Sequence, residues 1–416
     1  MRMSQKSHEF IKNMFADYYH SLTALNAPVR IESREFGFLT FAERIMLRHM
    51  SFDSVGGLEA YLEKTVPSDA YLSCAYYEQP EAEMDRKGWS GADLVFDIDA
   101  DHIPTSCDKI HDEWTCGECG FMGRGLGPEK CPACGGQKFD VKSWPCEVCL
   151  DSAKVETIKL LDMLTRDFGF SEGDVHVFFS GHRGYHIHVE DEKIREIDAN
   201  ARKEIVDYVC GLGLDTTLLG FSEKDWKIIR SPIRTDDAGW RGRVVTGVRG
   251  FIRNAKQEDY GALELKSNVI AAIVKNKEKI VDSWGDSRHW RPVKGVGFEN
   301  WKKIIEFCVD SVSANIDTVV TTDVHRLIRL TGSLHGKTGL KKVEFPVSSI
   351  EDFDPFKSAV AFKKGTALVF VSDSPEFRLG DVTLGPYKTQ RVELPVAAAV
   401  LLICKGRAEV VTQNVQ

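Results

Sequence analysis

Two aspartates behind a short apolar run place the strongest constraint on how this chain folds. The apolar run 94–96 leads directly into Asp97 and Asp99, which are separated by Ile98. On a strand, residues i and i+2 project from the same face, so the two carboxylates would lie side by side while Phe96 and Ile98 point into the core. Carboxylates that close repel one another unless a cation lies between them. The stretch therefore predicts a buried strand that ends at a divalent metal site.

A hairpin is predicted about eighty residues further on. Apolar residues alternate over 175–179, the loop 180–184 reads Ser-Gly-His-Arg-Gly, and a second strand over 185–189 places His186 on the face opposite its apolar residues. The glycines allow backbone N–H groups to turn toward an anion, and Arg183 and His186 add positive charge. Alone, this loop is also compatible with a plain hairpin, and the aspartates with solvated loop carboxylates. Together they favour a site for a metal and a triphosphate.

Seven of the eleven cysteines lie between residues 107 and 149. Two Cys-x-x-Cys pairs, the second followed by two glycines, have the spacing of a zinc ribbon, because each pair supplies two thiolates to one tetrahedral ion. The ribbon ligands would be Cys116, Cys119, Cys131 and Cys134. A possible second set of four ligands is Cys107, His111, Cys146 and Cys149. In a reducing compartment this clustering favours zinc over disulfides.

The length and charge of the chain narrow the class of protein. A chain of 416 residues can bury a large core and is expected to form more than one unit. The apolar run 394–404 is too short to span a bilayer and is interrupted by Pro395, so we expect a soluble, cytoplasmic protein without a membrane partner. A net charge of −8 argues against a protein that holds nucleic acid by bulk electrostatics. Local basic clusters at 227–256 and 326–342 could still follow a phosphate backbone, although a solvated face is an equal explanation for the first.

Periodicity gives a coarse order of elements. The expected segments are an amphipathic helix at 4–25, short strands at 30–40, helices at 153–168 and 298–308, a mostly helical charged region at 195–285, a return to the active-site sheet at 317–340, and short strands beyond 344.

These stretches resemble the catalytic small subunit of archaeal and eukaryotic replicative DNA primases, in the archaeo-eukaryotic primase superfamily, and most closely its archaeal form. The matching stretches are 33–38, 93–99, 180–186, 326–329 and 333–339. The resemblance implies an α/β (α+β) primase fold with two small sheets around the active site, a helical subdomain and an inserted zinc-binding module. The implied division is a catalytic core at 1–106, 150–194 and 286–416, a zinc module at 107–149 with the ribbon inserted at 112–145, and a helical subdomain at 195–285.

The resemblance also implies roles for individual residues. Two Mg²⁺ or Mn²⁺ ions would be bound by Asp97, Asp99 and Asp317. The incoming triphosphate would be bound by Ser180, Arg183, His186, Arg329 and His335. The family loop has Arg where this chain has His182, and some members have Lys at the position of Arg329. Asp323 is the alternative third carboxylate, but its position suggests that it caps a helical turn carrying Arg326 and Arg329. The family's zinc knuckle is best matched by Cys107, His111, Cys146 and Cys149, so that one or two structural zinc ions are expected.

The implied activity is DNA-templated synthesis of short RNA primers for replication by two-metal nucleotidyl transfer, with DNA synthesis as a further capability. Implied partners are a large iron–sulfur subunit, single-stranded template, and ribonucleoside and deoxyribonucleoside triphosphates. Three alternatives stay open: a repair-type primase-polymerase, a two-metal nuclease or phosphohydrolase, and a non-catalytic zinc-ribbon protein that binds nucleic acid. A nuclease needs no triphosphate loop, and a binding module needs neither Asp97 nor Asp99.

Overall fold

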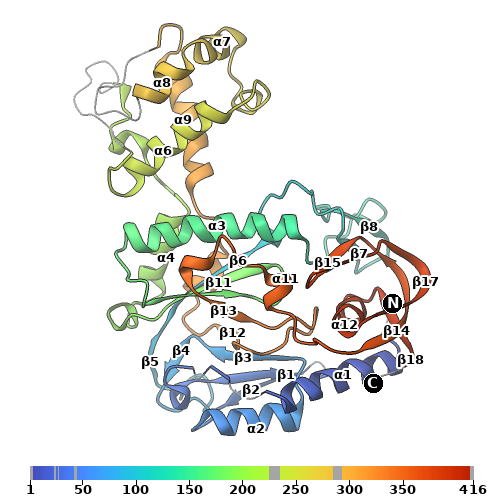
Figure 1. Ribbon diagram of the computed structural model, residues 1–416. Coiled ribbons are helices and arrows are strands. Elements are labelled where there is room, and N and C mark those ends of the chain that lie inside the picture. Colours follow the sequence, from blue (N-terminus) through green and yellow to red (C-terminus); the bar gives the residue numbers. More distant parts are fainter. Residues whose placement is uncertain are drawn as a thin grey trace. The chain divides into compact units, whose positions relative to one another are not determined.

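The computed structural model describes residues 3–22, 25–26, 28–41, 45–223, 235–283 and 293–412 (Figure 1). The chain forms two compact units: unit 1 is Met1–Val155, Glu172–Arg202 and Ile316–Gln416, and unit 2 is Glu156–Ser171 and Lys203–Asn315. Helices α3 (Glu147–Arg166) and α4 (Ala199–Val209) begin in unit 1 and end in unit 2. Part of the basic cluster expected at 227–256 lies outside the described residues. Within the described ranges, no helix is both long and apolar enough to cross a membrane.

The predicted metal strand and the predicted hairpin are confirmed and belong to one antiparallel sheet of unit 1. Its strand order is β13-β10-β11-β6. The bounds are β6 Leu94–Asp99, β10 Val175–Phe179, β11 Gly184–Val189 and β13 Val343–Phe345. Phe96 and Ile98 are completely buried, as the alternation predicts. Every residue of β11 is buried as well, since both faces of this strand are covered.

A second four-stranded sheet of unit 1 faces the first. It has the order β12-β3-β1-β2, with bounds β1 Phe36–Leu39, β2 Met46–Met50, β3 Asp69–Ser73 and β12 Leu327–Arg329. A cavity of about 130 Å³ lies between the sheets, lined by Leu72 and Ile328 of one and by Phe178 and His188 of the other. Within 317–340, the stretch expected to return to the active-site sheet, strand β12 pairs with β3 and so belongs to this second sheet.

The segment after Asp317 is helical, although its residues favour strands. Residues Thr318–Thr322, all threonine or valine, form the short helix α10. The side chain of Asp317 accepts a hydrogen bond from the backbone N–H of Val319, which caps the helix and outweighs that weak preference.

Helices and a third sheet complete unit 1. Helix α1 (Gln5–His20) begins after Ser4, whose hydroxyl accepts from the N–H of Ser7, and it ends five residues before the expected boundary. Helix α12 (Val396–Cys404) is apolar all round and is buried beneath the sheet β17-β14-β18. The remaining bounds are α2 Val55–Thr65, α11 Pro355–Ser358, β14 Thr366–Ser374, β17 Tyr387–Pro395, β18 Ala408–Thr412, β4 Ala75–Tyr77, β5 Trp89–Ala92, β15 Phe377–Leu379 and β16 Val382–Leu384. Helix α3 begins at Glu147, six residues earlier than its expected start.

The cysteine-rich insertion forms its own sheet, with the order β8-β7-β9. Its strands are β7 Glu113–Cys116, β8 Met122–Arg124 and β9 Phe139–Lys142.

Unit 2 is built from helices around an apolar seam. Their bounds are α6 Gly239–Asn254, α7 Ser267–Lys275, α8 Lys277–Ser283 and α9 Phe298–Val312. Helix α9 buries Trp301, Ile304, Ile305 and Cys308, which have the spacing of one helix face, and it packs against α6.

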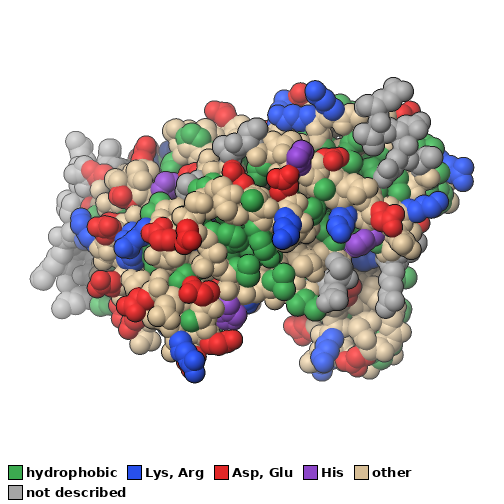
Figure 2. Space-filling model, turned by 90° about the horizontal axis from the view of Figure 1, so that it is seen from below, with side chains coloured by type: hydrophobic (Ala, Val, Ile, Leu, Met, Phe, Trp, Pro, Cys, Tyr) green, Lys and Arg blue, Asp and Glu red, His purple; other side chains and the backbone are tan. Residues whose placement is uncertain are grey.

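The surface shows how the net charge is distributed on one side of the molecule. On the face drawn in Figure 2, acidic and basic side chains are scattered among uncharged ones, and hydrophobic side chains gather near the centre. Among the residues described there, no continuous basic stripe is visible, in keeping with the net charge of −8.

Candidate metal and nucleotide site

Strand pairing brings the predicted metal strand directly beside the predicted phosphate loop. In the register of β6 and β11, Asp97 lies opposite His186 and Asp99 lies opposite Gly184. A side chain at Gly184 would place its Cβ 2.3 Å from the carbonyl oxygen of Ile98, so only glycine permits this approach. Two carboxylates and a glycine-rich loop that are far apart in the sequence therefore meet at one end of the sheet.

Both carboxylates of β6 have a raised pKa. Burial, and then the neighbouring charges of Asp99 and Asp317, raise the pKa of Asp97 to about 7. Burial also raises the pKa of Asp99, whose Oδ1 accepts from the backbone N–H of Asp101 at 2.9 Å. This charge repulsion is the electrostatic signature of a site that a divalent cation would stabilise.

Asp317 lies at this site, and Asp323 has a different local role. The backbone N–H of Asp317 donates to the carbonyl of Asp97 at 2.8 Å, which brings the start of α10 to the metal strand. Asp323 follows α10, and its Oδ1 accepts from the N–H of His325 at 2.9 Å. The prediction that a helical turn carries Arg329 is wrong, because Arg329 lies on strand β12. Asp323 lies in a turn that precedes this strand.

The loop between β10 and β11 is narrow and pre-shaped. Gly181 has a positive φ of 87°, which favours glycine, and its carbonyl accepts from the hydroxyl of Thr338 at 2.6 Å. Ser180 Oγ accepts from the N–H of His182 at 3.3 Å. Thr338 lies three residues after His335, so the loop of one sheet meets a loop that follows the second sheet.

Both predicted phosphate-binding histidines are neutral imidazoles. Burial lowers the pKa of both His186 and His335 well below the usual value. The Nδ1 atom of His335 accepts from the N–H of Lys337 at 3.1 Å, so its proton resides on Nε2, which can donate to an anion. His186 places Nε2 3.6 Å from Asp97 Oδ1 and leaves Nδ1 buried without a partner among the described residues.

The two predicted phosphate-binding arginines already have carboxylate partners. Arg183 contacts Asp101 and lies 2.8 Å from Asp112 Oδ2, with its Nε buried and unpartnered among the described residues. Arg329 donates to Asp69 Oδ1 at 2.8 Å, and the same oxygen accepts from the N–H of Gly336. Each arginine therefore also positions a loop of the site.

Three polar residues at this site were not found by sequence reasoning: Asp69, Asp112 and Lys405. Asp69 opens strand β3, and no local pattern marks it. Asp112 follows a predicted zinc ligand, and an acid next to such a histidine is a signal that could have been used. Lys405 lies at the far end of the chain and approaches the loop only through the packing of α12.

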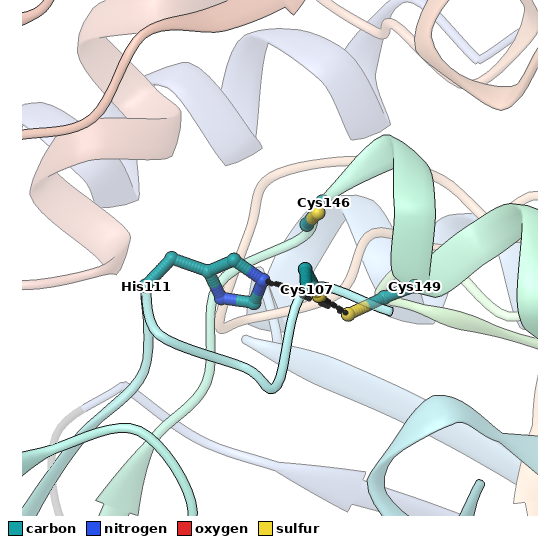
Figure 3. A group of neighbouring side chains, drawn as sticks. All are labelled: Cys107, His111, Cys146 and Cys149. Atoms are coloured by element: carbon teal, nitrogen blue, oxygen red, sulfur yellow. Dashed lines mark hydrogen bonds between the residues drawn. The ribbon is translucent and has the colours of Figure 1, made fainter. Parts of the chain in front are cut away.

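The second predicted cysteine set is brought together. The side chains of Cys107, His111, Cys146 and Cys149 offer ligand atoms that all lie within 4.8 Å of one another (Figure 3). The Nε2 atom of His111 lies 3.4 Å from the sulfur of Cys107 and 3.6 Å from that of Cys149. Three thiols and an imidazole at this spacing fit a tetrahedral zinc ion.

The ribbon set is brought together in the same way. Its members, whose ligand atoms also lie within 4.8 Å of one another, are Cys116, Cys119, Cys131 and Cys134. Among the described residues, only these two sets bring three or more possible ligand atoms this close together. The three aspartates of the β6 site are therefore spaced more widely than the members of either set.

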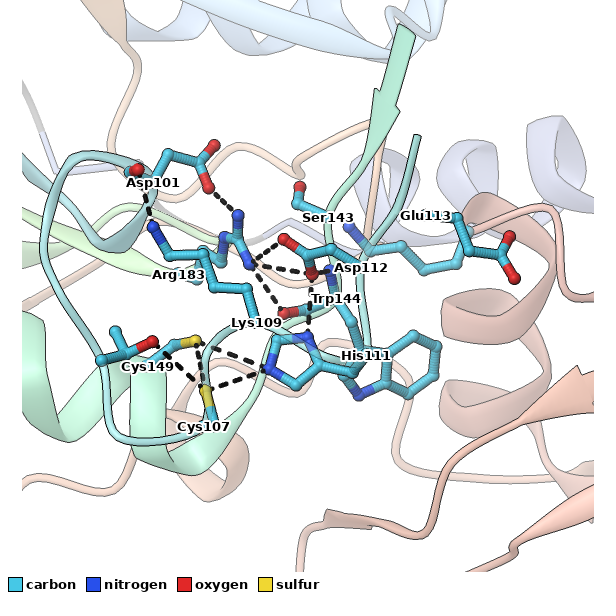
Figure 4. Close-up of polar contacts among 12 residues, drawn as sticks. Asp101, Cys107, Lys109, His111, Asp112, Glu113, Ser143, Trp144, Cys149 and Arg183 are labelled. Atoms are coloured by element: carbon cyan, nitrogen blue, oxygen red, sulfur yellow. Dashed lines mark hydrogen bonds and ion pairs between the residues drawn. The ribbon is translucent and has the colours of Figure 1, made fainter. Parts of the chain in front are cut away.

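One carboxylate connects the cysteine–histidine set with the phosphate loop. Asp112 accepts from His111 Nδ1 at 2.8 Å, from the backbone N–H of Trp144 at 2.8 Å, and from Arg183 on its other side (Figure 4). A carboxylate behind a histidine sets its tautomer and directs the other nitrogen at the metal. Asp112 thus positions His111, a predicted zinc ligand, and Arg183, a predicted phosphate ligand, together.

Comparisons with known proteins give the family that this chain is similar to. The pattern of the protein family described as DNA primase small subunit matches residues 140–347. The DNA primase small subunit PriS of Nitrosopumilus maritimus is 31% identical over 410 residues, covering 98% of this chain and 100% of the relative. Those of Methanothrix thermoacetophila and Archaeoglobus fulgidus are 34% and 35% identical, with coverage of 98% and 96% of this chain and 100% and 97% of the relative.

Proposed function

The chain belongs to the DNA primase small-subunit family, and on this premise we propose that the site at the ends of β6 and β11 carries out two-metal nucleotidyl transfer. The protein is the catalytic primase subunit, a DNA-directed nucleotidyltransferase that acts in replication. The pairing of Asp97 with His186 and of Asp99 with Gly184 is the observation that carries the site assignment, because it joins a cation site to an anion site. Templated incorporation of labelled nucleotides tests it.

The metal ligands in this proposal are Asp97, Asp99 and Asp317. Two divalent cations, Mg²⁺ or Mn²⁺, would supply a lowered pKa for the attacking 3′-hydroxyl and neutralise the leaving pyrophosphate. Two of the three aspartates have one oxygen that accepts a backbone hydrogen bond: Asp99 from the N–H of Asp101 and Asp317 from the N–H of Val319. These contacts hold the carboxylates in place before the cations arrive.

The phosphate ligands in this proposal are Ser180, Arg183, His186, Arg329 and His335. Neutral imidazoles with a free N–H can donate to phosphate oxygens without adding repulsion to the nearby arginines. The loop 180–184 adds backbone N–H groups that are directed by its two glycines. The same proposal assigns single-stranded template and nucleoside triphosphates as substrates, and 195–285 as a helical subdomain attached to the catalytic core.

Observations on this loop also separate the alternatives. A nuclease would use the carboxylates of β6 but would have no need for a triphosphate-binding loop at 180–184 with His335 beside it. A non-catalytic zinc protein would have no need to keep Asp97 at a raised pKa, which costs folding stability. Both alternatives predict that nucleoside triphosphates are not consumed in a template-dependent way.

We propose two structural zinc ions per chain, one in each cysteine-containing set. Glu113 and Lys142 are register partners in the ribbon sheet, so a short linker can close the gap left by removing 113–142. The deletion retains Asp112 and Trp144 and should lower the zinc content from two ions to one while primer extension persists. Metal analysis and extension by the same preparation measure both quantities. A single zinc ion in the full chain would contradict the second site.

We also propose a partner, a large iron–sulfur subunit that increases the affinity for the template. The net charge of −8 makes the chain by itself a weak binder of a polyanion. Purified alone, it should extend an existing primer better than it starts a new one, and the added large subunit should raise initiation more than extension. Initiation by the isolated chain at the rate of the pair would contradict this role.

A further inference from the structure

A buried lysine without a carboxylate partner lies beside the proposed phosphate site. Lys405 follows the last residue of α12 and is only 6% exposed. Its ammonium lies 2.6 Å from Nε2 of His182. Among the described residues, no Asp or Glu oxygen lies within ion-pair distance of it. A buried ammonium normally has such a partner, because burying an uncompensated charge destabilises the folded protein.

The surroundings of Lys405 add further positive charge. Burial, and then the nearby charges of Arg183 and Lys337, lower its pKa to about 7. The imidazole of His182 also contacts the hydroxyl of Ser143 at 3.2 Å and stacks on His335, with ring centroids 5.1 Å apart. Arg183 is neutralised by two aspartates, whereas Lys405 is not.

We propose that Lys405 binds a non-bridging oxygen of the incoming triphosphate and that His182 holds the ammonium in place for it. This proposal rests on the proposed function, since it adds a residue to that nucleotide site. His182 Nε2 accepts from the ammonium, so the lysine keeps two further N–H groups for an anion. Phosphate is the anion class that fits, because the neighbouring loop offers glycine-directed N–H groups and the Nε2–H of His335.

The ordinary alternative is a lysine that only stabilises the end of a helix. A cation at a helix C-terminus interacts favourably with the helix dipole, and Lys405 is the C-cap residue of α12. In that case its removal lowers the melting temperature and leaves nucleotide binding unchanged. A lysine that binds phosphate and has no carboxylate partner should behave in the opposite way. Its replacement with an apolar residue of similar shape should not lower the melting temperature, because the change removes an unpaired buried charge.

The test uses the full chain and the variant Lys405→Met, with Lys388→Met as the control. Lys388 lies exposed on β17 and undergoes the same chemical change. Thermal melts measure stability without ligand. Direct binding measures the dissociation constants of a non-hydrolysable ribonucleoside triphosphate and of the corresponding monophosphate, and primer extension gives kcat and KM.

We expect Lys405→Met to weaken triphosphate binding and raise the KM by about tenfold, the usual size of one charged hydrogen bond. The monophosphate affinity and the kcat of Lys405→Met should change by less than about threefold, as should all of these constants for Lys388→Met. The melting temperature of Lys405→Met should equal or exceed that of the wild type. Unchanged triphosphate binding, or a variant that does not fold, would overturn the proposal. A wild-type chain that binds triphosphate without polymerising would instead reject the proposed function.

Discussion

Asp97→Asn is expected to reduce nucleotide incorporation by roughly 10³-fold or more, because metal coordination supplies several kcal/mol of transition-state stabilisation. The amide keeps the size of the side chain but removes half of its capacity to bind a cation. Incorporation with Mg²⁺ and with Mn²⁺ measures the loss, and Asp323→Asn serves as the matched control. Residual synthesis above about one-tenth of wild type, a loss of only about 1.4 kcal/mol, would contradict the assignment of Asp97.

The same substitution should leave the metal-free protein at least as stable as the wild type. The pKa of Asp97 is raised from 3.8 to about 7, so its ionisation opposes folding at neutral pH. The wild type therefore becomes more stable as the pH falls from about 7 toward 4. Over this range the folded chain retains a proton on Asp97 that the unfolded chain releases. Asn cannot ionise, so its stabilising effect in a chelator should be largest at pH above 7 and shrink as the pH falls. Thermal melts across this range show the trend.

Asp317→Asn should also lower nucleotide incorporation by at least about 10²-fold, whereas Asp323→Asn should keep much of this activity. The backbone of Asp317 is hydrogen-bonded to Asp97, and its charge contributes to the raised pKa of that residue. Both aspartates accept a local backbone N–H, and Asn accepts the same bond, so both variants should lose well under about 1 kcal/mol of stability. An active Asp317→Asn and an inactive but folded Asp323→Asn would move the third ligand to Asp323.

Local patterns in the sequence were sufficient for the parts of the site that lie within one strand or one hairpin. The apolar run 94–96 predicted β6, the i, i+2 spacing placed Asp97 and Asp99 on one face, and glycines marked the loop before β11. Cysteine spacing predicted the ribbon set, since the two pairs are knuckles whose geometry is local. The side-by-side pairing of β6 and β11, however, depends on sheet order.

Residues whose role depends on packing between distant segments were beyond such patterns. Arg329 was expected on a helical turn, yet it lies on β12 in the facing sheet, where Asp69 neutralises it. Helix α10 forms because Asp317 caps it, although its Thr and Val residues favour a strand. Lys405 reaches the phosphate loop only because α12 packs as a buried helix behind it.

The most direct test of the central claim is template-dependent incorporation of single labelled nucleotides by the purified chain on a short primed template. With a divalent cation, the wild-type chain should add the nucleotide complementary to the template and release pyrophosphate, and Asp97→Asn should add none above background. Changing the template base should change the nucleotide that is added. Incorporation that ignores the template, equal incorporation by Asp97→Asn, or shortening of the primer in place of its extension would contradict a nucleotidyltransferase site at the ends of β6 and β11.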